Sequence, residues 1–373
     1  MSVLGNTQLR FDDDQAMLLD VSRSFCAERG GLGAARERLE APLAHSDELW
    51  AEIGSMGWTG IGLPEHLGGS GLGIGAAVPV LESMGKSMMA GPLMSNLLAS
   101  QLLLRADSEA AATLIEDFAG GAAGAVAELE SPDWGSLECD TQIDAEGAVH
   151  GKKLMVMDLQ SAQYVVVLAR REDRLCLAVV EVSALPEEAI SPRTLMDTTR
   201  RAADLSLDAV PSILVIDGER VEEAVRDYRL LGALFVAAES AGAAAACLDV
   251  TVDYLKTRKQ FGKLIGSYQA LKHPAVEILN AVDSARSFCY HAATLIDEGA
   301  LNEDAETACR MAKAQATDAL KFAGDRAVQF HGGMGFTWDC DAQLFIRRAQ
   351  WAQQQFGDSQ HHRRRLAALL LDA

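Results

Sequence analysis

The chain has few aromatic residues, few basic residues and no long apolar run. Its apolar runs 234–238 and 241–248 are separated by Glu239, far short of the ~20 residues that a membrane-spanning helix needs. Its 33 basic residues face 53 acidic ones, which gives a formal net charge of −20 over 373 residues. Phosphate binding requires a basic surface, so this balance argues against nucleic acid as a partner. We expect neither a membrane span nor a nucleic-acid interface.

Cysteine pairs and a secretory signal are also lacking. The seven cysteines are scattered and contain no C-x-x-C pair, so we expect buried free thiols rather than disulfides or a metal site. Residues 1–14 have neither the basic segment nor the apolar segment of a secretory signal, and we therefore expect a cytoplasmic protein. Apolar residues nevertheless make up 49% of the chain, which excludes a disordered polypeptide.

The hydrophobic pattern divides the chain into three parts. Helical spacing, interrupted by a glycine-rich loop at 58–75, extends to about residue 118 and starts behind the acidic run at 12–14. Alternating, β-branched segments then predict strands at 164–168, 175–182, 203–207 and 213–216. Helical spacing returns at 221–259, 268–299, 303–331, 338–353 and from 359 onward. We predict three domains: a helical one at 1–119, a β domain at 120–218 and a second helical one at 219–373.

Ordered motifs in all three parts resemble one known family. They are Leu63-Pro64-Glu65 with Gly68, Gly69 and Gly71; Arg258-Lys259-Gln260-Phe261-Gly262-Lys263 followed by Gln269 and His273; and the run Gln329–Thr337. With Arg347, Arg348 and Gly357 they cover nearly the whole chain in the order found in acyl-CoA dehydrogenases. The resemblance implies a mostly α fold with a central β domain: an N-terminal helical domain, a β-barrel-like middle domain and a C-terminal four-helix bundle. It also implies a dimer of dimers.

The resemblance implies FAD-dependent α,β-dehydrogenation of an acyl-CoA thioester, in fatty-acid or steroid side-chain β-oxidation. A carboxylate base takes the Cα proton, the Cβ hydride goes to flavin N5, and an electron-transfer flavoprotein accepts the electrons. Some bacterial relatives that act on steroid side chains combine catalytic and non-catalytic chains. The alternative is therefore a non-catalytic subunit of a heteromeric acyl-CoA dehydrogenase that completes the FAD site. A third reading is a relative that uses its flavin pocket for another reaction.

The same resemblance assigns the FAD-binding residues. In the family, the R-x-Q-F-G and Q-x-H-G-G segments reach the ADP part of FAD in the neighbouring subunit. Arginine suits a pyrophosphate because its fork donates parallel charged hydrogen bonds, and glycine lets backbone N–H groups approach an anion. The alternative for Arg258 is a solvated helix end, and the alternative for Gly332 and Gly333 is an ordinary turn. His331 could equally be a structural hydrogen-bond donor or a cofactor contact. The residues carried over are Arg258, Phe261, Gln269, Gln329, Gly332, Gly333, Asp358 and Gln360.

The glutamates that usually act as the base are missing. Phe356 stands where much of the family has a glutamate, and the glutamate of another branch falls on Gly232. Glu239 lies two helical turns further, roughly 10 Å along the same face. The helix around Glu239 consists mostly of small, apolar residues. The carboxylate of Glu239 would therefore be desolvated and its pKa raised, as a general base requires. We predict Glu239 as the base; a buried acid paired with an arginine, Asp358 as the base, and a base from another subunit remain open.

The middle region departs from the family as well. The family often reads T-E-P and then G-S, where this chain has Glu128-Leu129-Glu130-Ser131-Pro132 and then Gly135-Ser136. The usual W-I-T-N strand appears as Met155-Val156-Met157-Asp158, and methionine cannot donate the hydrogen bond of the threonine hydroxyl. Flavin contacts from this strand must come from backbone groups or be weaker, unless both methionines are simply strand core.

Two further features concern the substrate. Ala237, Ala238 and Ala241 could leave room for a bulky acyl group, but small residues also serve close helix packing. The basic cluster 363–365 could contact CoA or form a solvated helix end. The sequence leaves both questions open.

Overall fold

Helices form the first third of the chain. The computed structural model describes residues 13–106, 109–297 and 301–371, so most of the stretch 1–14, where we expect no secretory signal, lies outside the described residues. The helices are α1 (Asp13–Arg29), α2 (Leu32–Glu37), α3 (Asp47–Ser55), α4 (Ala77–Lys86), α5 (Leu93–Arg105) and α6 (Ala112–Ala119). The predicted loop at 58–75 contains three short 3-10 turns, placed where glycine and Pro64 interrupt the helical pattern.

The strands of the middle region form one mixed sheet. It contains β1 (Gly124–Ala127), β2 (Gln142–Ile143), β3 (Ala148–Met157), β4 (Tyr164–Arg171), β5 (Arg174–Glu181), β6 (Ile190–Arg193), β7 (Ala202–Pro211) and β8 (Leu214–Asp217). The four predicted strands correspond to β4, β5, β7 and β8, whereas the alternating pattern did not predict β1, β2, β3 and β6. The strand order is β6-β7-β3-β2-β4-β5-β8, and β1 pairs with β4 in parallel. Alternate residues of β4 face two cores: Val165 and Val167 pack within the sheet domain, whereas Val166 and Leu168 join the core of the helices. The sheet is thereby anchored to the helical layer.

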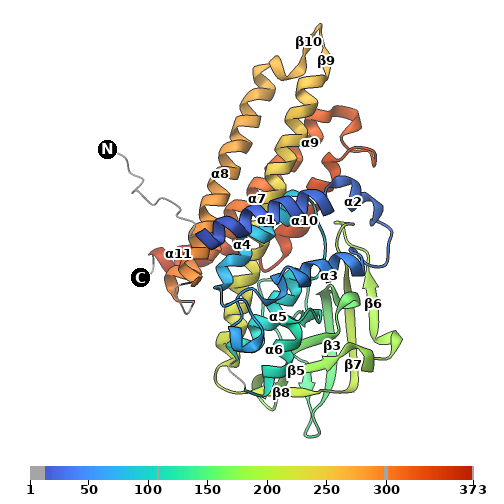
Figure 1. Ribbon diagram of the computed structural model, residues 1–373, viewed down its shortest axis with the longest axis vertical. Coiled ribbons are helices and arrows are strands. Elements are labelled where there is room, and N and C mark those ends of the chain that lie inside the picture. The colour runs from blue at the N-terminus through green and yellow to red at the C-terminus, as the bar shows by residue number, and fades with distance from the viewer. Residues whose placement is uncertain (1–12, 107–108, 298–300, 372–373) are drawn as a thin grey trace.

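Long helices form the last part of the chain. They are α7 (Val221–Thr257), α8 (Gln269–Asp297), α9 (Glu303–His331), α10 (Ala342–Gln354) and α11 (Ser359–Leu371), and a small hairpin of β9 (Lys259–Gln260) and β10 (Lys263–Leu264) joins α7 to α8. Figure 1 shows this hairpin at the far end of the bundle, away from the sheet. The mostly α fold with a central sheet is confirmed.

Helix α7 is the core helix of the molecule. It is long and apolar enough to cross a membrane, but 94% of its most apolar stretch is buried inside the protein. Helix α4 crosses it with the two backbones in contact: a Cβ on Gly242 would lie 1.9 Å from the Glu82 carbonyl oxygen, and one on Gly85 would lie 2.0 Å from that of Glu239. The small residues around Gly242 therefore serve close helix packing.

Candidate active site

The two positions that lack the family's glutamates touch one another. A Cβ on Gly232 of α7 would lie 2.4 Å from the Phe356 ring, so any side chain at 232 would force this ring to move. The Phe356 ring also packs edge-on against Trp134 and Tyr228, with ring centroids 6.2 and 5.7 Å apart. An aromatic cluster thus occupies the place where a base is expected.

A pocket opens beside this cluster, between the sheet and the helices. Residues from α5, β1, β3, α7 and α10 line it, together with the loop residues Trp134 and Phe356. Two buried acids, Glu128 and Asp158, face it, and burial raises the pKa of both carboxyls. Met155 and Met157 also line it and are therefore not simply strand core.

Glu239 is not among the residues that line this pocket. Its buried carboxylate forms ion pairs with Arg200 and with Arg348, whose Nη1 atom lies 2.8 Å from Oε1. Its Oε2 atom has no hydrogen-bond partner, but two guanidinium groups favour the ionised carboxylate and so oppose proton uptake. This geometry argues against Glu239 as the base and fits the alternative of a buried acid paired with arginines.

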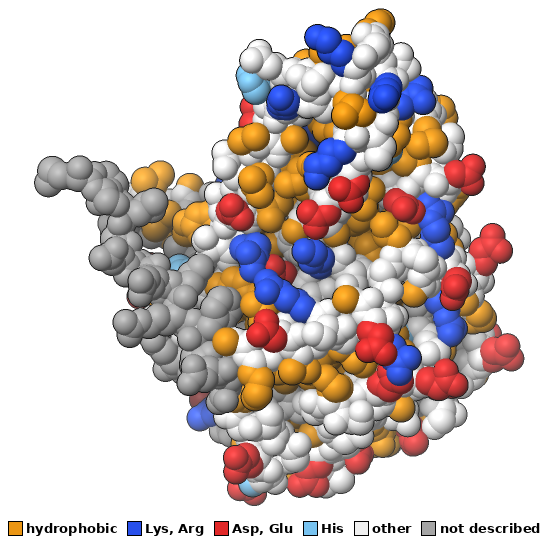
Figure 2. Space-filling view, turned by 45° about the horizontal axis from the view of Figure 1, so that its top comes forward, with side chains coloured by type: hydrophobic (Ala, Val, Ile, Leu, Met, Phe, Trp, Pro, Cys, Tyr) orange, Lys and Arg blue, Asp and Glu red, His pale blue; other side chains and the backbone are white. Residues whose placement is uncertain are grey.

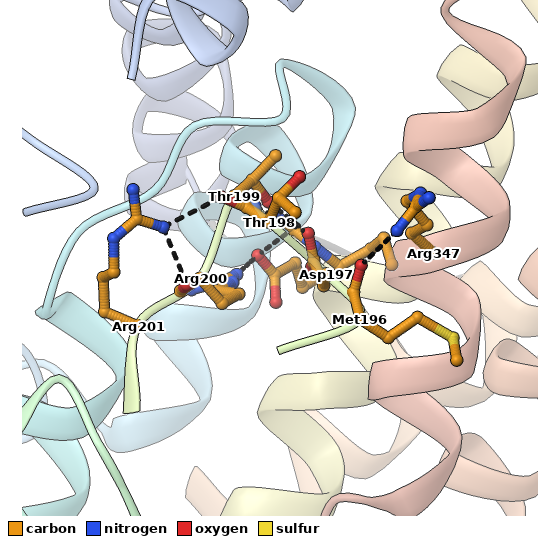
Figure 3. Close-up of polar contacts among 9 residues, drawn as sticks. Met196, Asp197, Thr198, Thr199, Arg200, Arg201 and Arg347 are labelled. Atoms are coloured by element: carbon orange, nitrogen blue, oxygen red, sulfur yellow. Dashed lines mark hydrogen bonds and ion pairs between the residues drawn. The ribbon is translucent and has the colours of Figure 1, made fainter. Parts of the chain in front are cut away.

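The arginines that hold Glu239 belong to a larger buried cluster. Arg348 of α10 also binds the carboxylate of Asp197 and the hydroxyl of Thr199, and all three side chains are buried. Figure 3 shows Asp197, Thr199 and Arg200 on one loop that faces the helix carrying Arg347. Two arginines thus balance two carboxylates, and the cluster ties the sheet domain to α7 and α10.

The residues expected to bind the ADP part of FAD lie at the other end of the bundle. Arg258 ends α7, Gln269 begins α8, and Gln329 lies in the last turn of α9, where Leu255, Ile265 and Phe330 pack together. Figure 2 shows basic and hydrophobic side chains together on this end. The predicted residues Arg258, Phe261, Gln269, Gln329, Gly332 and Gly333 are all exposed, Phe261 to 91%.

His331, in contrast, is buried. It stacks on Tyr254 with ring centroids 4.2 Å apart, and its Nδ1 atom lies 2.8 Å from the Ala327 carbonyl oxygen. Both contacts are internal to the bundle. The structure thus gives His331 the role of a structural group.

Asp358 and Gln360 lie apart from that exposed set, at the start of α11 (Figure 1). Asp358 accepts a hydrogen bond of 2.7 Å from the backbone N–H of His361. It lines a cleft of about 550 Å³ with Gly135, Ser136 and the arginines Arg364 and Arg365. These arginines offer positive charge to an anion in the cleft. Gln360 is exposed on the same helix.

Two buried basic residues support the loop that carries Phe356. Lys313 donates a hydrogen bond of 2.8 Å to the Gly357 carbonyl, and His362 Nε2 lies 3.1 Å from the Phe356 carbonyl oxygen. Burial lowers the pKa of Lys313 to about 7. Burial and the neighbouring Lys313 lower the pKa of His362 to about 2.

The His362→Gln variant should be less sensitive to acid than the wild type. Folded His362 stays neutral down to about pH 2, whereas the unfolded chain takes up this proton near pH 6.5. The unfolded state binds more protons in this window, so His362 lowers stability as pH falls, by about 1.4 kcal/mol per pH unit. Denaturant unfolding at about pH 6 and about pH 4 should show a shallower loss in the variant. His66→Gln, at an exposed position, is the control, and equal losses in all three proteins would contradict the prediction.

Comparison with known proteins agrees with this architecture. Residues 12–121 match the model of the acyl-CoA dehydrogenase N-terminal domain, and residues 215–371 match that of the C-terminal domain. Acyl-CoA dehydrogenase IpdE2 of Mycolicibacterium smegmatis is 30% identical over 361 residues, which cover 95% of this chain and 98% of that protein. The chain belongs to the acyl-CoA dehydrogenase family, whose members are FAD-dependent oxidoreductases acting on CH–CH groups.

Solved structures share the fold at lower identity. The Tcur3481-Tcur3483 steroid ACAD superposes with a TM-score of 0.83 at 24% identity, covering 96% of this chain and 98% of that one. The ChsE4-ChsE5 complex from Mycobacterium tuberculosis superposes with a TM-score of 0.84 at 21% identity, covering 98% and 100%. The prediction of the family is confirmed.

The donor groups of the pocket lining suit the ring system of FAD, although the pocket volume of about 40 Å³ is smaller than that ring. Arg200 Nε and Trp351 Nε1 are buried donors without a hydrogen-bond partner, and both residues line the pocket. A buried unpaired donor costs about 1–3 kcal/mol, and the carbonyl and ring-nitrogen acceptors of a flavin would satisfy both. Met155 and Met157 supply apolar surface for the ring.

Sequence reasoning named Glu128 and Asp158 only as parts of segments that depart from the family and gave neither a role, and it missed Arg200. Glu128 directly follows β1 and Asp158 directly follows β3, a position that could have drawn attention to both acids. For Arg200 the sequence carries no comparable signal, because its partners lie far away along the chain.

Proposed function

We propose that this chain catalyses the FAD-dependent α,β-dehydrogenation of an acyl-CoA thioester within an oligomer. The supporting observation is the separation of two half-sites. The exposed residues for the ADP part of FAD lie at one end of the bundle, and the buried pocket for its ring system lies against the sheet (Figure 1). A cofactor shared between two chains uses both half-sites, which favours a dimer, and the family resemblance adds the proposal of a dimer of dimers.

Each half-site has its own task in this proposal. FAD supplies the hydride acceptor when bound. Arg200 and Trp351 would donate hydrogen bonds to the ring, and the apolar pocket walls would exclude water, which would strengthen these contacts. At the far end, Arg258 and Gln329 hold the ADP part bound to a neighbouring chain. An electron-transfer flavoprotein is the proposed electron acceptor, and the acyl group is a fatty acid or a steroid side chain.

The colour of the purified protein tests this proposal. The chain, expressed alone, should be yellow with a flavin spectrum, and an acyl-CoA should bleach it without oxygen. Octanoyl-CoA and a cholanoyl-CoA are the two probes, because they represent straight-chain and steroid acyl groups. Flavin that no acyl-CoA bleaches would contradict dehydrogenation and favour another flavin reaction.

A second candidate function is a non-catalytic subunit that completes the FAD site of a different chain. Two observations favour it: positions 232 and 356 carry no base, and the pocket volume is only about 40 Å³, room for a few water molecules. The ChsE4-ChsE5 complex shows that the same fold occurs in assemblies of two chains. A colourless chain that turns yellow only with a co-expressed second acyl-CoA dehydrogenase chain would support this candidate.

A further inference from the structure

Glu128 is a buried carboxylate on the wall of the pocket. It directly follows β1, is 5% exposed, and lines the pocket together with Phe356. Its Oε1 atom lies 3.4 Å from the Tyr228 hydroxyl, whereas its Oε2 atom has no hydrogen-bond donor. The guanidinium of Arg229 approaches Oε2 only to 3.6 Å, and its own hydrogen bond goes to the Trp134 carbonyl. One buried oxygen of this pocket-lining residue is thus left without a hydrogen-bond donor.

The electrostatic environment suits proton uptake. Burial raises the pKa of Glu128 above the ordinary value of 4.5, and Arg229, Tyr228 and Lys153 offset this only in part. A general base works best when its pKa lies near the working pH. The charges of Arg229 and Lys153 favour the ionised carboxylate, while burial favours the protonated one.

The other acids near the pocket are engaged. Two arginines hold Glu239, which does not line the pocket. Asp158 lines it, but its Oδ2 atom accepts a hydrogen bond of 2.6 Å from Ser95. Glu130 binds the buried Lys153 and is likewise not part of the lining. Among the described acids that line this pocket, only Glu128 has a buried oxygen without a donor.

We propose that Glu128 is the catalytic base of this chain, an inference that rests on the proposed dehydrogenation. The Cα–H bond of the thioester breaks and its proton passes to Oε2 of Glu128. The electron pair of that bond forms the Cα=Cβ double bond as the Cβ hydride leaves to FAD, which is the oxidant. Tyr228 is a positioning residue, because its hydroxyl donates a hydrogen bond to the other carboxylate oxygen.

The Glu128→Gln variant tests the assignment. Glutamine keeps the size of the side chain but cannot accept the proton, so we expect at least about a 100-fold slower bleaching of the flavin. Exchange of the Cα proton with deuterated water should be lost, while FAD content and the melting temperature stay near those of the wild type. Glu138→Gln, the same substitution at an exposed position outside the pocket lining, is the matched control and should retain Cα exchange.

Two further measurements separate catalysis from structure. Tyr228→Phe removes a hydrogen bond that lowers the pKa of Glu128, so the acid limb of the pH profile should move to higher pH. Infrared difference spectra between wild type and Glu128→Gln should show a carboxyl C=O band that titrates above pH 4.5 without any substrate. A merely structural glutamate would leave the acid limb of the pH profile unchanged.

The outcomes test the role of Glu128 separately from the proposed dehydrogenation. If an acyl-CoA bleaches the wild type and Glu128→Gln at the same rate, the assignment of Glu128 as the base is wrong, but the proposed dehydrogenation still holds. Wild type that holds flavin and neither bleaches nor exchanges the Cα proton overturns both. A carboxyl band that titrates at the ordinary value, or no difference band, also overturns the assignment.

Discussion

Replacing Arg348 with methionine should lower the free energy of unfolding by about 3–5 kcal/mol, the usual cost of breaking a buried ion pair from one side. Arg348 is 1% exposed and binds Asp197, Thr199 and Glu239 at once. Methionine fills similar space but leaves two buried carboxylates with less positive charge. Because these partners come from the sheet domain and from α7, the loss should weaken the attachment of the sheet to the bundle.

The neighbouring Arg347 provides a matched control for this prediction. It belongs to the same helix and donates hydrogen bonds of 3.2 Å to the Met196 carbonyl (Figure 3) and 3.1 Å to Gln343, but it binds no carboxylate among the described residues, so its loss leaves no buried charge unpaired. Thermal and denaturant unfolding of both methionine variants at neutral pH gives the comparison. Equal stability losses for Arg347→Met and Arg348→Met would show that burial of the ion pairs does not determine the effect.

The helices and strands could largely be read from the sequence because each depends on local periodicity. Predicted strands 175–182 and 213–216 correspond to Arg174–Glu181 and Leu214–Asp217, and the predicted helix 268–299 corresponds to Gln269–Asp297. The family motifs identify Gly232 and Phe356 independently as the two positions that lack a glutamate. The structure places these two residues in contact. The domain boundaries and the roles of the site residues stay predictions.

The environment of Glu239 could not be read from the sequence in the same way. The sequence shows one acid in an apolar helix, which suggests desolvation. Its partners Arg200 and Arg348 lie 39 residues before it and 109 residues after it, and periodicity contains no information on such distant pairs. The small residues of α7 are likewise explained only by the crossing of α4 over Gly242. The absence of a side chain at Gly232 is explained only by the Phe356 ring that packs against it.

The Arg258→Glu variant should raise the dissociation constant of FAD by about 100-fold or more. Charge-assisted hydrogen bonds contribute about 1.5–3 kcal/mol each, and the substitution also places a negative charge against the pyrophosphate. FAD absorbance per chain after gel filtration gives the retained fraction. Lys259→Glu, the same change of charge at the next exposed position, should retain FAD, and equal retention by both variants would contradict the role of Arg258.

Complementation between two variants shows whether Arg258 acts on a neighbour's cofactor. Arg258→Glu keeps an intact pocket, whereas Val126→Trp should block the pocket, which Val126 lines, and keep an intact Arg258. If each cofactor uses the pocket of one chain and the arginine of the other, a mixed oligomer of the two variants regains FAD in half of its sites, although neither variant retains it alone. If one chain supplied both parts, the mixed oligomer would regain none, because every chain would carry one defect.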